Sequence, residues 1–372
     1  MKKELNIGIV GAGGFAAFAS AAFMRIPGIN IIAVTDINPA TANALAKSCN
    51  AETFPDLDNF LKNKKTDLVY IATPPYLHYE QSKKALLAGK HVICEKPAAL
   101  KTTEAEELLA LASSKQLLYV VNLMQRYNPL YGIVGTIVKQ KILGDFIHGF
   151  FENYASDENL GEDHWFWDKQ KSGGIFIEHG VHFFDMFTGW LGTGKIINAV
   201  QLQRMNTGKE IFDRVQATVL YPGGLVNFYH GFDQPTVLDR QEIRLQFERG
   251  EITLYEWVPV KMKLHGLFEI EQLNRLRELI RDFSMSHHTQ NSGNKKSKGR
   301  FKEISYDDHI TIEYGNSADK QKRYVELLTS MMNDQWSWIR DRNHVRIIDG
   351  SNAVESLRTA EAATSSAQKY LI

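Results

Sequence analysis

The chain has 372 residues, an ordinary globular composition and no excess of either charge. Hydrophobic residues make up 44% and charged residues 23%, and 43 Lys plus Arg balance 43 Asp plus Glu. A neutral chain has no global basic field with which to hold nucleic acid or an anionic membrane. The length exceeds what one hydrophobic core usually supports, so we expect two domains.

The N-terminal segment and the cysteines indicate the cellular compartment. The N-terminus enters a strand-like run at Leu5 without an apolar secretory segment. No run approaches the roughly 20 apolar residues of a membrane span. The two cysteines, Cys49 and Cys94, cannot form a disulfide framework, and Cys94 is interpreted as a small buried hydrophobe. We therefore expect a cytoplasmic protein.

The first 122 residues alternate short apolar runs with amphipathic stretches. Continuous Val/Ile-rich strands between helices indicate a parallel sheet that is covered on both faces. Such doubly wound sheets bind ligands at the carboxyl ends of their strands. Strands are predicted at residues 5–10, 29–34, 68–72, 91–94 and 117–121, and helices at 13–24, 39–48, 57–62, 76–87 and 103–114.

Residues 123–372 have a different pattern, in which strands follow one another with turns between them. This predicts an α+β domain with a large, mostly antiparallel open sheet. The polar stretch 284–300 predicts a mobile surface loop, although its basic residues could instead hold an anion. The last of the helices could pack back on the N-terminal domain. After a segment at 146–154, strands are predicted at 196–205, 212–220, 224–232, 242–247 and 252–257, and helices at 130–140, 318–332 and 352–370.

A glycine-rich turn directly follows the first predicted strand. The residues Gly11-Ala12-Gly13-Gly14-Phe15-Ala16 fit the dinucleotide fingerprint G-x-G-x-x-G/A. Gly11 permits a tight turn, Gly13 lets the backbone approach a pyrophosphate, and Ala16 allows close helix–strand packing. The N-terminus of the following helix favours an anion, so we expect Gly11, Gly13, Gly14 and Phe15 to bind the cofactor.

Asp36 ends the second predicted strand, where a carboxylate can accept hydrogen bonds from ribose hydroxyls. It would repel a 2′-phosphate, and no Arg or Lys follows at positions 37–40. The pattern therefore favours NAD over NADP. A helix N-cap before Pro39 is the alternative role of Asp36.

Two further motifs follow the third and fourth predicted strands: Thr73-Pro74-Pro75-Tyr76-Leu77-His78 and Glu95-Lys96-Pro97. With these the chain resembles the glucose–fructose oxidoreductase/inositol dehydrogenase/MocA (Gfo/Idh/MocA) family. The likeness extends through the glycine run, acid and Gly-x-His of residues 172–185. It implies an N-terminal Rossmann domain and an open C-terminal sheet that often forms the interface of a homo-dimer or homo-tetramer. It also implies that Lys96 lies beside the nicotinamide and the reacting carbon, and that Thr73, Pro74, His78 and Glu95 shape the cofactor groove.

Residues 176–191 have helical apolar spacing, and Glu178, His182 and Asp185 are spaced so as to lie on neighbouring faces. One carboxylate could then orient the imidazole of His182 while its other nitrogen meets a substrate. The family commonly has Asp where this chain has Glu178, which puts the substrate in doubt. A metal site built from these residues and His179 was the alternative. We expect no bound metal, because the redox chemistry of the family needs no metal.

The remaining candidates concern the substrate. Trp165 and Trp167 could stack on a sugar ring or simply pack. Asn122, Gln125 and Arg126 could reach cofactor or substrate, or begin a helix, and His179 and Asp185 are also candidate substrate contacts. Lys96 and His182 both remain possible proton acceptors, since an imidazole has a suitable pKa and burial can lower that of a lysine.

These motifs predict an NAD-dependent dehydrogenase that transfers hydride between nicotinamide and a hydroxyl-bearing carbon of a sugar, cyclitol or derivative. Two alternatives stay open: an NAD-dependent, redox-assisted glycoside hydrolase, and a non-catalytic NAD/sugar sensor. The exact substrate, the reaction direction and the oligomer size are not fixed by these motifs.

Overall fold

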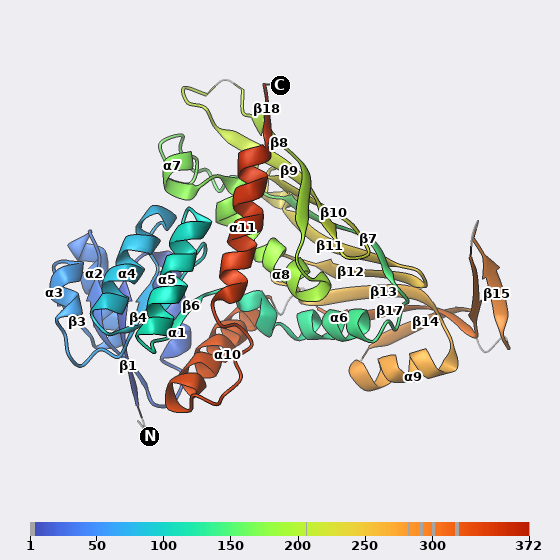
Figure 1. Ribbon diagram of the computed structural model, residues 1–372, viewed down its shortest axis with the longest axis horizontal. Coiled ribbons are helices and arrows are strands. Elements are labelled where there is room, and N and C mark those ends of the chain that lie inside the picture. Colours follow the sequence, from blue (N-terminus) through green and yellow to red (C-terminus); the bar gives the residue numbers. More distant parts are fainter. Residues whose placement is uncertain are drawn as a thin grey trace. The chain divides into compact units, whose positions relative to one another are not determined.

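Figure 1 shows the computed structural model, which describes residues 4–205, 207–281, 283–289, 293–299, 302–316 and 320–371. Its residues group into two compact units. The first contains Met1–Tyr127, Glu162–Asp185 and Tyr324–Ser365, and the second contains Asn128–Gly161, Met186–Arg323 and Ser366–Ile372. The family-based division at residues 122 and 123 stays a prediction. Within the described ranges, no helix has both the length and the apolarity needed to cross a membrane.

A six-stranded parallel sheet forms the centre of the first unit, with the strand order β3-β2-β1-β4-β5-β6. This is the order of a doubly wound dinucleotide-binding sheet, and it confirms the predicted α/β fold. Strands in its middle are apolar throughout because both of their faces are covered, as in the fully buried β4. The strands are β1 (Leu5–Val10), β2 (Ile29–Thr35), β3 (Glu52–Phe54), β4 (Leu68–Ile71), β5 (His91–Cys94) and β6 (Tyr119–Val121).

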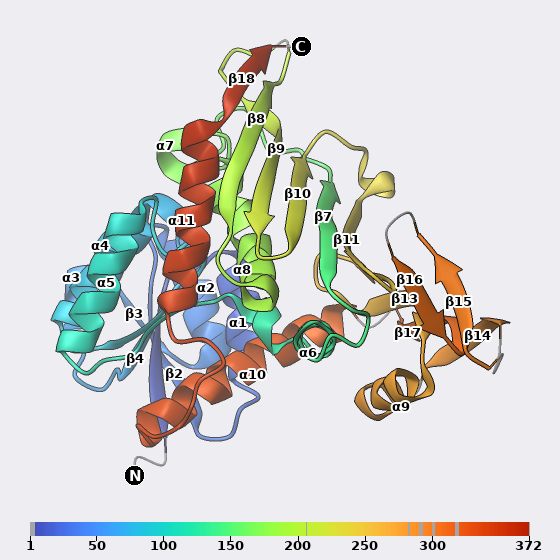
Figure 2. The same cartoon turned by 45° about the vertical axis from the view of Figure 1, so that its right-hand side comes forward.

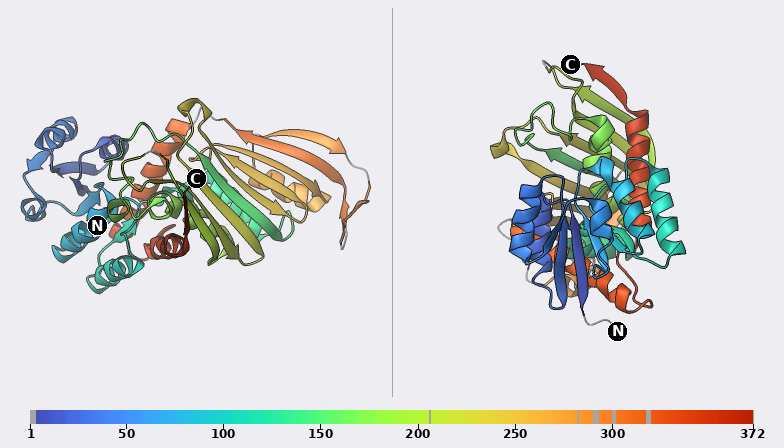
Figure 3. Two further views of the ribbon diagram at one scale, coloured as in Figure 1. Left: turned by 90° about the horizontal axis from the view of Figure 1, so that it is seen from above. Right: turned by 90° about the vertical axis from the view of Figure 1, so that its left-hand side faces the viewer.

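Helices lie on both sides of this sheet (Figure 3). Helix α2 shows how the sequence sets their ends: the Asn38 side chain accepts from the Ala40 N–H at 3.0 Å, Pro39 occupies the first turn, and Asn50 ends the helix in the left-handed region. The unit contains α1 (Gly14–Phe23), α2 (Pro39–Cys49), α3 (Leu57–Leu61), α4 (His78–Leu87), α5 (Thr102–Ser114) and α11 (Ser351–Ser366), and most of α10 (Lys320–Arg340). Helix α11 contacts α5, because the Glu361 carboxylate accepts from the backbone and hydroxyl of Thr102.

The second unit is built on a ten-stranded sheet with the order β14-β17-β13-β12-β11-β7-β10-β9-β8-β18 (Figure 2). It is mostly antiparallel, as predicted, and β7–β10 and β8–β18 are its parallel pairs. Alternate residues of each strand are buried, as in β13. The strands are β7 (Phe146–Tyr154), β8 (Lys195–Gln203), β9 (Phe212–Tyr221), β10 (Gly224–Gly231), β11 (Arg240–Phe247), β12 (Gly250–Tyr255), β13 (Lys261–Phe268), β14 (Ser284–Thr289), β17 (Asp308–Gly315) and β18 (Gln368–Leu371).

Aromatic side chains pack against the buried face of this sheet. Phe187 lies in α8 (Val181–Leu191), and its ring centroid is 5.0 Å from that of Phe228 in β10. Trp190 of the same helix stacks on Tyr131 of α6 (Pro129–Lys139) at 5.2 Å. Helix α9 (Ile270–Leu279) and a two-stranded ribbon, β15 (Lys295–Lys298) with β16 (Glu303–Tyr306), complete the unit.

Three expectations need correction. The polar stretch 284–300 is not a loop throughout, because it contributes β14 and β15, while residues 290–292 and 300 lie outside the described residues. An edge strand can be polar because pairing uses its backbone. The helix predicted at 352–370 ends at Ser366, and β18 follows it. The helix predicted at 318–332 runs instead from Lys320 to Arg340, and residue 318 lies outside the described residues.

Candidate functional site

The glycine turn of the first unit leaves open space beside the N-terminus of α1. A Cβ built on Gly13 or Gly14 would meet no atom within 4 Å, whereas one on Gly11, at φ +89°, would lie 2.7 Å from the Ala72 carbonyl oxygen. Gly11 is therefore required by the turn itself. Gly13 and Gly14 are not needed for packing, and helix α1 has neither a side-chain cap nor an acid in its first turn. This turn fits a dinucleotide pyrophosphate.

Asp36 follows β2 and binds this turn directly. Its Oδ2 accepts from the Ala12 N–H at 2.6 Å, and its Oδ1 accepts from the Asn38 N–H at 2.7 Å and the Thr41 hydroxyl at 3.2 Å. Asn38, not Asp36, is the N-cap of α2. A carboxylate offers about four acceptor sites, so three bonds within the chain leave one for a ribose hydroxyl.

His78 holds two loops of the site together. It is 1% exposed, and its Nδ1 and Nε2 each lie 2.7 Å from a carbonyl oxygen, of Pro97 and Thr73 respectively. Burial lowers the pKa of His78, and the two carbonyl contacts oppose that shift. The Thr73 hydroxyl donates to Gln81 Oε1 at 2.6 Å, and Pro74 precedes the short helix η1 (Pro75–Leu77). His78 thus fixes the loop after β4 against the Glu95-Lys96-Pro97 turn.

Glu95 directly follows β5 and accepts hydrogen bonds from a residue of β4 and from the residue that follows β6. The donors are the Tyr70 hydroxyl and the Asn122 amide, the second at 2.8 Å. Burial raises the pKa of Glu95. Both predicted residues, Glu95 and Asn122, therefore meet here, where they fix the start of the lysine turn.

Lys96 reaches from this turn to Glu178. Its Nζ donates to Glu178 Oε1 at 2.5 Å and to the Glu178 carbonyl oxygen at 2.9 Å, and their side chains are 19% and 10% exposed. An ammonium group has three donors, so one N–H is left for a ligand oxygen. Glu178 lies in a π-helical turn, η3 (Phe176–Gly180), that leads into α8. Such turns occur frequently at functional sites.

His182 lies one turn further along, in α8, and is 4% exposed. Its pKa lies well below the usual 6.5, first because of burial and second because of the positive charge of Lys96. The imidazole is therefore neutral at neutral pH. Lys96 contacts Glu178 and its charge acts on His182, so the three residues predicted as catalytic lie near one another within the first unit.

Asp185 has a different partner from the one its spacing suggested. Arg126, from the short helix η2 (Met124–Tyr127), donates to both of its carboxylate oxygens at 2.8–3.0 Å, and the Asn352 amide donates at 3.0 Å. Burial raises the pKa of Asp185, which is 1% exposed, and Arg126 opposes that shift. Asp185 and Arg126 therefore tie η2 to α8 and α11.

Aromatic residues precede the glycine run, and they differ in burial. Trp167 is 8% exposed and packs edge-on against Phe166 at 4.7 Å, while Trp165 is half-buried. His179 is half-buried, with its ring 5.3 Å from that of Phe183. Gln125 is 1% exposed. Of the two tryptophans, Trp165 has more surface to offer a substrate.

Three residues that contact predicted site residues were not themselves predicted. Tyr70 contacts Glu95, Asn352 contacts Asp185, and Tyr324 contacts Phe15. The rings of Phe15 and Phe18 in α1 lie 6.1 and 5.0 Å from that of Tyr324. Tyr70 is hidden within an apolar strand, and the other two come from helices far along the chain. Only an alignment of relatives could have singled them out.

The fold and this site define a Rossmann-fold oxidoreductase that binds a nicotinamide dinucleotide. Two family models match the chain. Residues 5–123 match the NAD-binding Rossmann-fold domain of the oxidoreductase family, and residues 134–253 match the Gfo/Idh/MocA C-terminal domain. The chain belongs to the Gfo/Idh/MocA oxidoreductase family.

Curated relatives agree with this membership. An uncharacterized oxidoreductase, sll0816, from Synechocystis is 32% identical over 50% of this chain and 51% of its own length. Glucose-6-phosphate 3-dehydrogenase from Bacillus subtilis is 26% identical over 59% and 62%. The first relatives are thus matched over about half their length. 2,7-Anhydro-N-acetylneuraminate hydratase from Escherichia coli is 22% identical over 97% of this chain and 94% of its own.

Solved structures share the whole fold at low identity. Levoglucosan dehydrogenase, in complex with NADH, superposes with a TM-score of 0.76 at 16% identity over 98% of this chain and 96% of its own. KijD10, a 3-ketoreductase from Actinomadura kijaniata in complex with NADP and TDP-benzene, gives 0.76 at 16% over 99% of both chains.

Proposed function

We propose that this protein is an NAD-dependent dehydrogenase that transfers hydride between nicotinamide and a hydroxyl-bearing carbon of a sugar, cyclitol or derivative. The observation that carries the proposal is the Lys96–Glu178–His182 group, which lies in the same compact unit as the glycine turn. The family brings oxidoreductase chemistry, and several relatives are named for sugar substrates.

The preference for NAD rests on Asp36. One acceptor position of its carboxylate is left for a ribose hydroxyl, and no Arg or Lys at residues 37–40 could balance a 2′-phosphate. The exposed Ile37 side chain follows it, with apolar surface for an adenine face. KijD10 is named in complex with NADP and levoglucosan dehydrogenase with NADH, so the fold accommodates either nucleotide and this assignment depends on residue 36.

His182 is the proposed proton acceptor. Its lowered pKa keeps the imidazole neutral, so it can take the hydroxyl proton as the carbon is oxidised. The remaining N–H of Lys96 would donate to the same substrate oxygen and stabilise the negative charge that develops there. Glu178 holds Lys96 with its carboxylate and its carbonyl, which limits the positions that the ammonium can take.

Substrate turnover tests the proposal directly. The protein is mixed with NAD or NADP and a panel of polyols, cyclitols, sugar acids and sugar phosphates, and the NADH absorbance band is followed. We expect reduction with at least one class and a preference for NAD, and an Asp36→Ala variant with a reduced preference. Absence of hydride transfer across the panel, with NADH shown to bind, would remove the dehydrogenase assignment.

A redox-neutral reaction is the second candidate, and one relative favours it. The relative that matches nearly the full length is named a hydratase, a reaction with no net change in oxidation state. Redox-assisted glycoside cleavage belongs to the same class. It would show product release that requires catalytic NAD but accumulates no NADH, and the same panel with product analysis distinguishes it.

We also propose a homo-oligomer formed through the large sheet. Leu220 of β9 and Leu225 of β10 are paired across the strands and are 45% and 42% exposed. Ile147 of β7 and Ile197 of β8, on the neighbouring strands, are also exposed, and larger exposed apolar patches mark protein–protein interfaces. Light scattering should give a dimer or tetramer, and Leu220→Asp with Leu225→Lys should shift it toward monomer. A monomeric wild type would contradict the proposal.

A further inference from the structure

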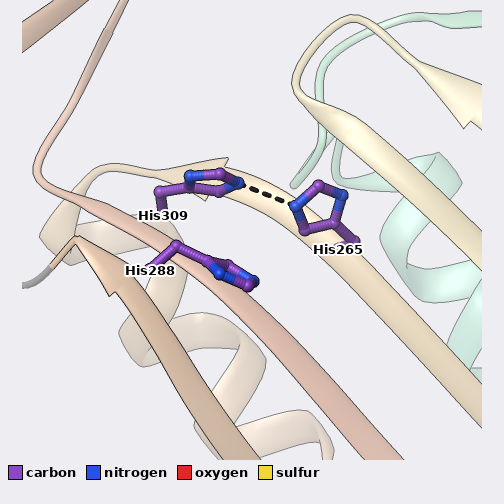
Figure 4. A group of neighbouring side chains, drawn as sticks. All are labelled: His265, His288 and His309. Atoms are coloured by element: carbon purple, nitrogen blue, oxygen red, sulfur yellow. Dashed lines mark hydrogen bonds between the residues drawn. The ribbon is translucent and has the colours of Figure 1, made fainter.

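Three histidines of the second unit meet near one edge of the large sheet. His265 lies in β13, His288 in β14 and His309 in β17, which are adjacent strands (Figure 4). Ligand atoms of all three imidazoles lie within 4.8 Å of one another. No local sequence pattern marks this cluster, because each histidine is in a different strand.

The strand register explains why the side chains share a face. In the β13–β17 pair, His265 is opposite Thr311 and Leu267 is opposite His309. The intervening Ile310 is fully buried, so residues 309 and 311 point to the other face. An irregularity in β14 between residues 287 and 289 changes its register, and the His288 Nε2 lies 2.9 Å from the Thr311 hydroxyl oxygen.

The distances fit a shared ion. His265 Nε2 lies 2.7 Å from His309 Nε2, and the ring centroid of His288 lies 5.5 and 4.6 Å from those of His265 and His309. A tetrahedral ion with nitrogen ligands at 2.0–2.1 Å needs nitrogens roughly 3.3 Å apart. The closest pair is nearer than this and the outer limit of 4.8 Å is wider, so the observed separations lie on either side of the required one and the rings rotate when an ion binds.

The hydrogen bonding of the histidines is also compatible with metal binding. The His265–His309 contact requires one nitrogen to donate and the other to accept, which neutral imidazoles provide. Metals bind imidazole in its neutral form. Glu251, opposite His265 in β12, adds a carboxylate on the neighbouring strand.

We propose that His265, His288 and His309 bind one divalent transition-metal ion of the Zn²⁺ class, with a fourth position open to water or another ligand. Imidazole ligands favour Zn²⁺, Cu²⁺ or Ni²⁺ over Mg²⁺ and Ca²⁺, which prefer oxygen. The ion would join three strands side to side and fasten the edge strand β14. This proposal departs from the prediction of no metal, which rested on the residues around Glu178 and on the redox chemistry of the family.

Metal binding by tag-free protein tests the site. The protein is stripped with a chelator and titrated with Zn²⁺ by calorimetry, with bound metal measured after dialysis. We expect one Zn²⁺ per chain, an affinity at least tenfold lower in His309→Ala and His288→Ala, and no change in His287→Ala. His287 is the matched control because it neighbours His288 but lies near Asp308 instead. Absence of saturable binding, or full affinity in both cluster variants, would overturn the proposal.

A second measurement covers the case in which His309→Ala does not fold. His288 is exposed on an edge strand, so His288→Ala should fold normally. Zn²⁺ should raise the thermal midpoint of the wild type and not that of His288→Ala, since binding stabilises only the folded state. Mg²⁺ should have no effect, because it prefers oxygen ligands to imidazole nitrogens. An equal rise in both proteins would place the ion elsewhere.

Discussion

Lys96 and Glu178 form a contact whose value lies in positioning and not in stability. Both side chains are largely shielded from water, at 19% and 10% exposed. The desolvation of such a pair offsets much of its attraction, so it is weak evidence for stabilisation. What the pair provides is an ammonium held by two acceptors of a single residue, with one N–H left over.

Lys96→Met tests that role. The methionine side chain has similar length but no donor, so we expect kcat to fall about 100- to 1,000-fold, the usual cost of removing a donor to developing charge. NADH affinity, measured by fluorescence, should stay close to wild type. Lys101→Met, at an exposed lysine nearby, is the control and should retain activity. Full turnover in Lys96→Met would favour a sensor.

The pH dependence of alcohol oxidation tests His182. An imidazole below its own pKa is already protonated and cannot accept another proton. Because burial and Lys96 lower the pKa of His182 well below 6.5, kcat/KM should be flat through neutral pH and fall only at pH below 6.5. His182→Asn should remove this limb and lower the rate about 10²- to 10⁴-fold. An acid limb centred above pH 6.5 would assign the proton to another group.

At the scale of elements, the β1–α1 turn separates two kinds of glycine. Gly13→Ala places a methyl group in open space at an ordinary φ of −69°, so folding should be unchanged while NADH binds at least tenfold more weakly. Gly11→Ala combines φ +89° with a 2.7 Å contact to the Ala72 carbonyl, so it should cost about 1–3 kcal/mol of stability. Thermal unfolding and NADH titration of both variants provide the check. Equal affinities for Gly13→Ala and wild type would contradict pyrophosphate binding there.

The sequence predicted the elements whose pattern is local. Apolar runs and the glycine turn gave five of the strands of the parallel sheet, but β3 was missed because its three residues are largely exposed. Residues 176–191 were predicted as one regular helix, whereas the structure begins it with a π-helical turn. Hydrophobic spacing contains no signal for that extra residue per turn, which changes where Glu178 and Asp185 point. Their partners, Lys96 and Arg126, could therefore not be distinguished from the chain alone.

At the scale of the whole molecule, buried histidines should make the protein sensitive to acid. Burial lowers the pKa of His230 from 6.5 to about 3. Between these values the unfolded chain binds a proton that the folded chain does not, so stability falls as pH drops below about 6.5, by about 1.4 kcal/mol per pH unit.

Urea unfolding from pH 7 to pH 4 checks this dependence. His230→Gln cannot titrate, so its unfolding free energy should vary less with pH than that of the wild type. His148→Gln is a control at a half-buried histidine of the same sheet. Parallel pH profiles for wild type and His230→Gln would show that another group governs acid unfolding.

The last strand of the large sheet has a practical consequence. β18 runs parallel to β8 and is paired with Val200 through Gln203. A truncation before Gln368 would make β8, with nine residues, the edge strand in place of β18, with four. A longer edge strand has more open amides and carbonyls that can pair with an extended peptide, which favours aggregation. Purification tags and fusion partners are therefore better attached before β1, where they leave the β8–β18 pairing unchanged.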